Sequence, residues 1–236
     1  MTAALLIAAH GTRSPQGTDT ISAFVDAVAR SRSDVPVSLC FLDVSEPSLR
    51  DALEATDARP LIVMPLLLSA GYHVSSDIPH VVAGRSDVLV ARHLGPDPAI
   101  ITAVADRLAE ARSAERGGPL PARSAQRGDA PNTFLAAVAS SRSSARAEVD
   151  EAARLLANRL GEPVSVLPLD GDLATTVAGL PQRSDVAVYL LAEGGFLDAL
   201  RVAMNGHGVI AEPIGTHHAA VSLVWARYDE ALGRVR

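Results

Sequence analysis

Short apolar runs alternate along the first half of the chain with longer stretches in which apolar residues recur every three or four positions. The apolar runs predict strands at residues 5–9, 37–42, 61–68 and 88–91. The stretches with helical spacing predict helices at residues 21–30, 48–55, 76–83 and 99–112. Because the strand runs are continuously apolar, we expect both faces of the sheet to be buried. The alternation of strands and helices therefore predicts an α/β fold with a parallel sheet between helix layers.

The second half of the chain repeats the first. Residues 113–132 are rich in Gly and Pro and contain little that could be buried, which predicts a flexible linker. Beyond this linker the blocks recur in the same order: residues 5–14 align with 134–143, 36–43 with 163–170, and 66–72 with 190–196. An internal repeat of this kind predicts two similar lobes with a cleft between them. We place the N-terminal lobe at residues 1–112 and a degenerate C-terminal lobe at residues 133–236.

The two halves differ most in the polar residues at the ends of their strands. His10 has Ala139 as its counterpart in the repeat, and His73 has Leu197. Ligands of open α/β sheets bind outside the carboxyl ends of the strands, where these differences fall. We therefore expect a working site in the first lobe and a second lobe that closes over it.

Three strand ends of the first half carry residues that could bind a metal ion. His10 and Asp43 end the first two predicted strands, and His73 follows the third. Two imidazoles and a carboxylate suit a divalent transition metal and proton transfer near neutral pH. Because no further His or Cys completes a closed tetrahedral site, coordination positions stay open, as metal delivery or catalysis requires. Gly11 is expected to let a ligand approach the backbone closely.

Several residues near these histidines could bind an anionic substrate. Arg13 is close to His10 and suits a carboxylate or phosphate group. Ser75 or Ser76 is the predicted N-cap of the next helix, and Asp77 lies in its first turn. The start of a helix favours a bound anion, so Ser75 and Ser76 are candidates for contacts with the substrate. The remaining histidines are expected at the surface or in turns: His80, His93, His207 and the neighbouring pair His217 and His218. Trp225 and Tyr228 lie three residues apart on the last predicted helix and are expected in the core.

Composition narrows the class of protein further. Hydrophobic residues make up 48% and charged residues 20%, which is typical of a globular chain with a sizeable core. The net charge of −6 gives no support for a nucleic-acid or anionic-membrane surface. Cys40, the single cysteine, excludes a disulfide framework and is expected to be buried as an apolar residue. The longest aliphatic run is far shorter than the roughly 20 residues of a membrane span, and the start lacks the basic region of a signal peptide, which predicts a cytoplasmic protein.

Two motifs of the first half carry a family resemblance. The run His-Gly-Thr-Arg at residues 10–13, joined to Leu-Leu-Ser-Ala-Gly-Tyr-His-Val-Ser-Ser-Asp-Ile-Pro at residues 67–79, resembles the CbiX/SirB-type sirohydrochlorin chelatases. Residues 41–49 are similar to the second-strand motif of that family, with Asp43 where its members commonly have Glu. The resemblance covers residues 4–112 directly, and residues 133–236 only through the internal repeat.

The resemblance implies insertion of a divalent metal, Fe²⁺ or Co²⁺, into sirohydrochlorin on the way to sirohaem or cobalamin. It implies that two lobes enclose the tetrapyrrole, and that His10 and His73 bind the metal and help to remove the pyrrole protons. It makes Asp43 a third catalytic residue, and it adds Ser69, Gly71 and Tyr72 to the substrate contacts. The metal is then a substrate, no permanently bound cofactor is expected, and the protein is expected to be a monomer.

Other functions are weighed against this one. The chain has no Gly-rich phosphate loop, so the reaction is expected to proceed without ATP. A metal carrier or sensor of the same fold would use the same two histidines without turnover, and it remains the alternative. A non-catalytic interaction module would be consistent with the second lobe alone. A histidine phosphatase would need Arg immediately before His10, where this chain has Ala9.

Overall fold

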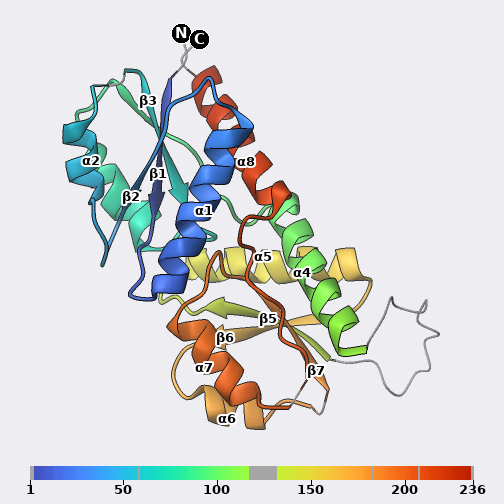
Figure 1. Cartoon of the computed structure of the whole chain (residues 1–236). Coiled ribbons are helices and arrows are strands. Elements are labelled where there is room, and N and C mark those ends of the chain that lie inside the picture. Colours follow the sequence, from blue (N-terminus) through green and yellow to red (C-terminus); the bar gives the residue numbers. More distant parts are fainter. Residues whose placement is uncertain (1–2, 58, 117–131, 182, 207, 235–236) are drawn as a thin grey trace.

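The computed structural model describes residues 3–57, 59–116, 132–181, 183–206 and 208–234. It contains two parallel sheets, each lying between layers of helices (Figure 1). The two lobes face each other across a cleft. This arrangement confirms the α/β fold and the two similar lobes predicted from the apolar pattern and the repeat.

The first sheet brings three strand ends to one edge. Its strands are β1 (Ala4–Ala9), β2 (Val37–Phe41), β3 (Leu61–Leu66) and β4 (Val88–Val90), in the order β2-β1-β3-β4. All neighbours are parallel, and Ala9 pairs with both Phe41 and Leu66. The chain therefore leaves β1, β2 and β3 at the same edge of the sheet, as the sequence analysis requires.

The second sheet repeats this topology with one strand fewer. It contains β5 (Asn132–Val138), β6 (Val164–Leu169) and β7 (Ser184–Val188), in the order β6-β5-β7, all parallel. The order matches that of β2-β1-β3. A single bridge between Val186 and Ile210 stands where the first sheet has β4.

Helices cover both sheets. Those of the first half are α1 (Pro15–Ser31), α2 (Leu49–Ala55), the π-helical turn η1 (His73–Asp77), α3 (Ile78–Val82) and α4 (Pro98–Arg116). Those of the second half are α5 (Ser143–Leu160), α6 (Leu173–Ala178), α7 (Gly195–Met204) and α8 (His218–Gly233).

Two helix boundaries differ from the predicted ones by more than three residues. Helix α1 begins six residues earlier than expected, because the Ser14 hydroxyl accepts the Gly17 amide at 3.3 Å and Pro15 suits a first turn. Helix α4 continues through residues 113–116, which were predicted to be linker. The remainder of the predicted linker, residues 117–131, lies outside the described residues.

The two repeats exchange their final helices. Helix α4 of the first repeat packs on α5 and β7, whereas α8 of the second repeat packs on α1, β3 and β4 (Figure 1). Tyr228 of α8 is fully buried, as expected, and its hydroxyl donates to the Ala3 carbonyl at 2.6 Å. Arg112 of α4 binds Asp185 of β7 at 2.7 Å. One hydrophobic core therefore runs through both lobes.

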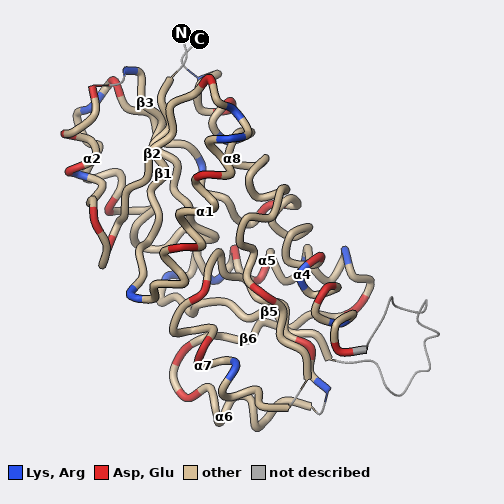
Figure 2. The backbone as a smooth tube through the Cα atoms, viewed as in Figure 1, with Lys and Arg blue, Asp and Glu red and all other residues tan. Residues whose placement is uncertain are grey.

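Burial and charge agree with the composition. Cys40 is buried, and burial raises the pKa of its thiol to about 12, so it remains protonated. Acidic and basic residues are interspersed over both lobes (Figure 2). None of the helices in the described ranges is long and apolar enough to cross a membrane. The cytoplasmic location stays a prediction.

Candidate active site between the lobes

A cleft of about 1110 Å³ lies where the carboxyl ends of the two sheets face each other. This volume is slightly above the roughly 300–1,000 Å³ of small-molecule sites. Both lobes line it. Ten residues were predicted to have a catalytic or substrate-binding role. Seven of them line the cleft: His10, Gly11, Arg13, Ser69, Gly71, Tyr72 and His73.

The two histidines lie side by side because they follow neighbouring strands of the first sheet. His10 follows β1 and His73 opens η1 after β3, and these two strands are neighbours in the sheet. Their ring centroids lie 4.8 Å apart with the rings nearly perpendicular, at 86°. The His10 residue is exposed and the His73 side chain is 20% exposed, so both can reach a ligand in the cleft.

His73 has a carboxylate partner, Asp77, which the sequence pattern places only in the first turn of the next helix. The Nδ1 atom of His73 lies 2.9 Å from Oδ2 of Asp77, four residues later. This contact fixes the ring and leaves Nε2 as the nitrogen that can bind a metal, an arrangement common among metal-binding histidines. The signal in the sequence was the i, i+4 spacing, which brings the two side chains together within the helical turn of η1.

Asp43 is not among the residues that line the cleft, although its neighbour Val44 is. One carboxylate oxygen of Asp43 accepts the Val44 amide at 2.8 Å. The backbone of Asp43 has a separate role, because its amide donates to the His10 carbonyl at 2.9 Å. Within the described residues no group of three or more His, Cys, Asp or Glu side chains could hold a metal ion. The two facing imidazoles therefore stand as a pair.

Ser75 and Ser76 are not helix caps, and they do not line the cleft. The helical turn already begins at His73, so both serines lie inside η1. The Ser75 hydroxyl donates to the Gly71 carbonyl at 2.8 Å. The Ser76 hydroxyl accepts a hydrogen bond from Arg142 of the second lobe at 3.3 Å. The predicted N-cap is wrong because Tyr72 already has helical backbone angles.

Exposed apolar side chains gather at the cleft. Five large hydrophobic residues are exposed in the described part of the chain, and four of them line the cleft: Val44, Tyr72, Val138 and Phe196. They come from both lobes. Concentrated apolar exposure of this kind marks a surface that binds an apolar ligand face or a partner.

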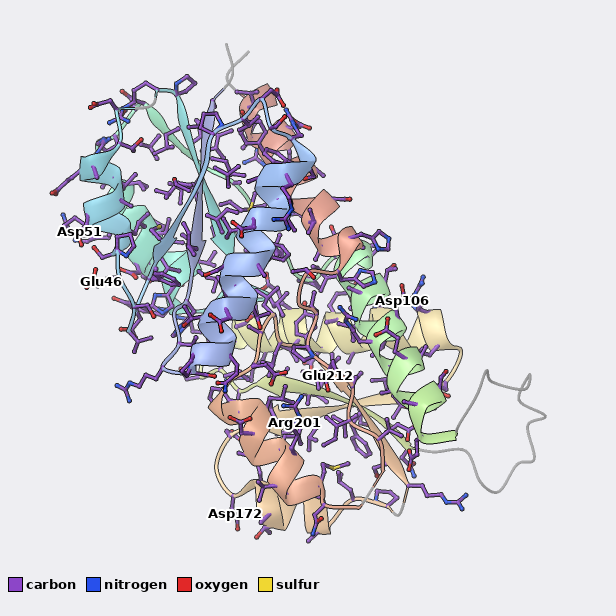
Figure 3. The ribbon with its side chains drawn as sticks, viewed as in Figure 1. Glu46, Asp51, Asp106, Asp172, Arg201 and Glu212 are labelled. Atoms are coloured by element: carbon purple, nitrogen blue, oxygen red, sulfur yellow. The ribbon has the colours of Figure 1, made fainter. Side chains whose placement is uncertain are left out.

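The second lobe carries an ion pair where the first has the His73 turn. Glu193 lines the cleft and binds Arg201 at 2.8 Å. Arg201 also binds Glu212 at 2.7 Å, and Figure 3 labels these two residues. Arg201 is the counterpart of Asp77 in the repeat. The second lobe thus presents no pair of imidazoles at its strand ends in the part of the chain that the structure describes.

His217 and His93 are less exposed than expected. The His217 side chain is only 9% exposed, because Nδ1 accepts the Ala219 amide at 3.2 Å and caps α8. Burial lowers the pKa of His217 below its ordinary value. His93 is 11% exposed and its Nε2 lies 3.2 Å from a carboxylate oxygen of Glu148. The sequence pattern gave no sign of either contact, because the partner of His217 is a backbone amide and the partner of His93 is distant along the chain.

Three histidines remain. His80 and His218 are exposed, as predicted. His207 lies outside the described residues.

Solved chelatase structures share this fold. Sirohydrochlorin chelatase SirB from Bacillus subtilis subspecies spizizenii, solved in complex with cobalt, superposes with a TM-score of 0.75 at 20% identity, covering 99% of this chain and 97% of that one. CbiX, described as the terminal enzyme for biosynthesis of siroheme in denitrifying bacteria, superposes with a TM-score of 0.66 at 19% identity, covering 97% and 99%. The fold is therefore that of the two-lobed chelatases.

Sequence comparison finds relatives of the N-terminal part of the chain. Residues 4–111 match the CbiX family model. Sirohydrochlorin cobaltochelatase of Methanothermobacter thermautotrophicus is 28% identical over 131 residues, which cover 45% of this chain and 91% of that protein. The corresponding enzyme of Methanosarcina barkeri is 32% identical over 82 residues, covering 34% and 63%. The match to the CbiX family is thus confined to the N-terminal part of the chain, which is the part that carries the motifs quoted above.

Proposed function

We propose that this protein inserts a divalent metal ion, Fe²⁺ or Co²⁺, into sirohydrochlorin in the cleft between its lobes, without ATP. The observation that carries the proposal is the pair His10 and His73, whose rings lie 4.8 Å apart and line a cleft of about 1110 Å³. Relatives named for both metals support it, since a sirohydrochlorin ferrochelatase of Priestia megaterium is 29% identical over 117 residues. Supply of the metal in the cell, rather than the site, decides between the two ions.

Metal insertion requires the site to bind an ion without enclosing it. His10 and His73 offer two nitrogen ligands of the type that Fe²⁺ and Co²⁺ accept. A site with two protein ligands leaves positions for water and then for the pyrrole nitrogens. The ion can therefore be transferred to the macrocycle by exchange of one ligand at a time.

Two pyrrole protons must leave as the metal enters. Neutral imidazole accepts a proton, and the Asp77 carboxylate at 2.9 Å from Nδ1 of His73 stabilises the imidazolium that forms. His10 is exposed, so a proton that it accepts can pass directly to water. In this scheme each imidazole accepts one of the two protons on the nitrogen that it frees when it releases the metal to the macrocycle.

The cleft suits a flat, polyanionic macrocycle. Val44 and Tyr72 from the first lobe and Val138 and Phe196 from the second can cover its apolar faces. Arg13 is exposed at the cleft and can bind a peripheral carboxylate. The substrate is thus held by contacts from both lobes while its centre faces the two histidines.

The test is anaerobic metal insertion followed by the absorbance change of the tetrapyrrole. We expect His10→Ala and His73→Ala each to lower kcat at least about a hundredfold, in the range for loss of a general base. Circular dichroism should show both variants folded. His80→Ala, in the helix that follows η1 but exposed, is the matched control and should keep wild-type kcat. Near-normal turnover in both active-site variants would contradict the proposal.

The same assay separates an enzyme from a metal carrier. An enzyme converts many equivalents of sirohydrochlorin for each protein molecule, whereas a carrier delivers one metal ion and stops. A yield limited to one equivalent would establish the carrier.

A further inference from the structure

The segment that leads into His73 is held by the second lobe. The Tyr189 hydroxyl donates to the Leu68 carbonyl at 3.1 Å. Burial raises the pKa of Tyr189 far above its ordinary value, so the hydroxyl keeps the proton that it donates. Two residues later, the Ala70 amide donates to Oε2 of Glu148 at 2.5 Å. Both partners lie in the second repeat, whose strand ends carry no imidazole pair in the described residues.

Arg142 of the second lobe contacts the chain on both sides of His73. The Arg142 guanidinium lies 5.4 Å from the centre of the Tyr72 ring and donates to the Ser76 hydroxyl at 3.3 Å. Contacts from the second lobe therefore precede and follow His73 along the chain.

Glu148 has the most connected position among these partners. It lies on α5, and the oxygen that accepts the Ala70 amide is also 3.2 Å from Nε2 of His93. His93 directly precedes Leu94, whose amide donates to the Leu67 carbonyl at 2.9 Å. One carboxylate thus joins the exit of β3 to the exit of β4. Without it, the Ala70 amide would lose its acceptor.

We propose that Glu148 is a positioning residue, which together with Tyr189 holds residues 68–72 from the opposite lobe so that His73 faces His10. The inference rests on the proposed function and gives the second lobe a role beyond covering the substrate. It sets the separation of the two metal-binding imidazoles.

The experiment uses the full chain and steady-state Co²⁺ insertion under anaerobic conditions. For Glu148→Ala we expect kcat to fall about 10- to 100-fold, as for small misplacements of catalytic groups, with KM for sirohydrochlorin changed less than about threefold. Glu148→Gln keeps an oxygen that can accept the Ala70 amide and should restore most of kcat. Glu151→Ala, on the same helix with a side chain that is 41% exposed and paired with Arg154, is the matched control and should match wild type.

Binding of Co²⁺ alone gives a readout that does not depend on turnover. We expect Glu148→Ala to weaken Co²⁺ affinity about tenfold, as measured by visible absorption, because groups that orient metal ligands typically contribute 10- to 100-fold. Tyr189→Phe removes only the hydroxyl that binds Leu68, so it tests the same segment if Glu148→Ala does not fold. It should lower kcat about threefold to tenfold, the effect of one hydrogen bond.

Several outcomes would overturn the positioning role. They are wild-type kcat and Co²⁺ affinity in folded Glu148→Ala, a Glu148→Gln variant as impaired as Glu148→Ala, or, where Glu148→Ala does not fold, an unchanged Tyr189→Phe. If the wild-type protein binds Co²⁺ but inserts none, the proposed function fails. The comparison of Co²⁺ affinities then still decides the role of Glu148.

Discussion

Gly11 offers the sharpest test of how the site is built. It follows His10 with a φ of +96°, in the region that favours glycine. A Cβ atom added there would lie 2.0 Å from the backbone oxygen of Asp43. That oxygen cannot simply move away, because the Asp43 amide is bonded to the His10 carbonyl at 2.9 Å. Glycine at position 11 therefore allows the chain after β1 to pass close to the chain after β2, next to the ligand site.

The structure sets the size of the effect of Gly11→Ala. The positive φ costs about 1–2 kcal/mol for a residue with a Cβ atom. Relieving the overlap requires the two strand exits to separate by about 1 Å, and a misplacement of that size can lower catalysis about a hundredfold. We expect the free energy of unfolding to fall by about 2–4 kcal/mol, within the range of strained backbone substitutions.

Gly84→Ala is the matched control. Gly84 also has a positive φ, +78°, but no atom lies within 4 Å of an added Cβ. It should show the backbone cost alone, about 1–2 kcal/mol, with unchanged kcat. Urea unfolding and metal insertion are measured for both variants. If Gly11→Ala matches Gly84→Ala in stability and kcat, the crowded strand exits do not hold His10 in place.

Three further predictions concern charged groups. Asp77→Asn should lower kcat about tenfold or more in the insertion assay, because the amide can still bind His73 but does not stabilise its charged form. Asp43→Asn should change kcat less than about threefold, since the side chain does not line the cleft and an amide oxygen can still accept the Val44 amide. Burial lowers the pKa of His217 in the folded chain, so on acidification the unfolded chain protonates this histidine at a higher pH than the folded chain does. The protein therefore loses stability as the pH falls below about 6.5, the ordinary pKa of histidine. His217→Asn caps without titrating and should therefore lose less thermal stability between pH 7 and pH 5, as thermal melts will show.

The strands and the histidine pair could be predicted from the sequence because each depends on a short, strong pattern. Strand β1 is buried along its whole length, so its apolar run marks both ends to within a residue. His10 and His73 follow strands that a repeated βα pattern makes neighbours, and their encounter needs no detail of side-chain packing. Helix α1 starts earlier than predicted because its first turn, beginning at Pro15, has no apolar side chain on the sheet side.

The remaining features depend on contacts that leave no periodic trace. The apolar face of α8 shows that the helix is buried but not which of two similar sheets it covers. A carboxylate at a strand end gives the same sequence signal whether it faces the cleft or its own backbone. The sequence therefore could not show that the Asp43 side chain accepts the Val44 amide or that Asp77 contacts His73. Glu148 lies on a helix whose pattern explains only its buried face, and its contacts with Ala70 and His93 cross between the lobes.

The exchange of α4 and α8 also bears on how the chain folds during synthesis. The four strands of the first sheet are complete by Val90, yet the helix that covers part of this sheet begins only at His218. At roughly 5–20 residues per second, the ribosome needs on the order of ten seconds to make the intervening chain. During that time Ile62, Met64 and their neighbours in the shared core are not yet covered by α8. We therefore expect the first lobe to reach its native state only after α8 has left the ribosome, together with the second lobe.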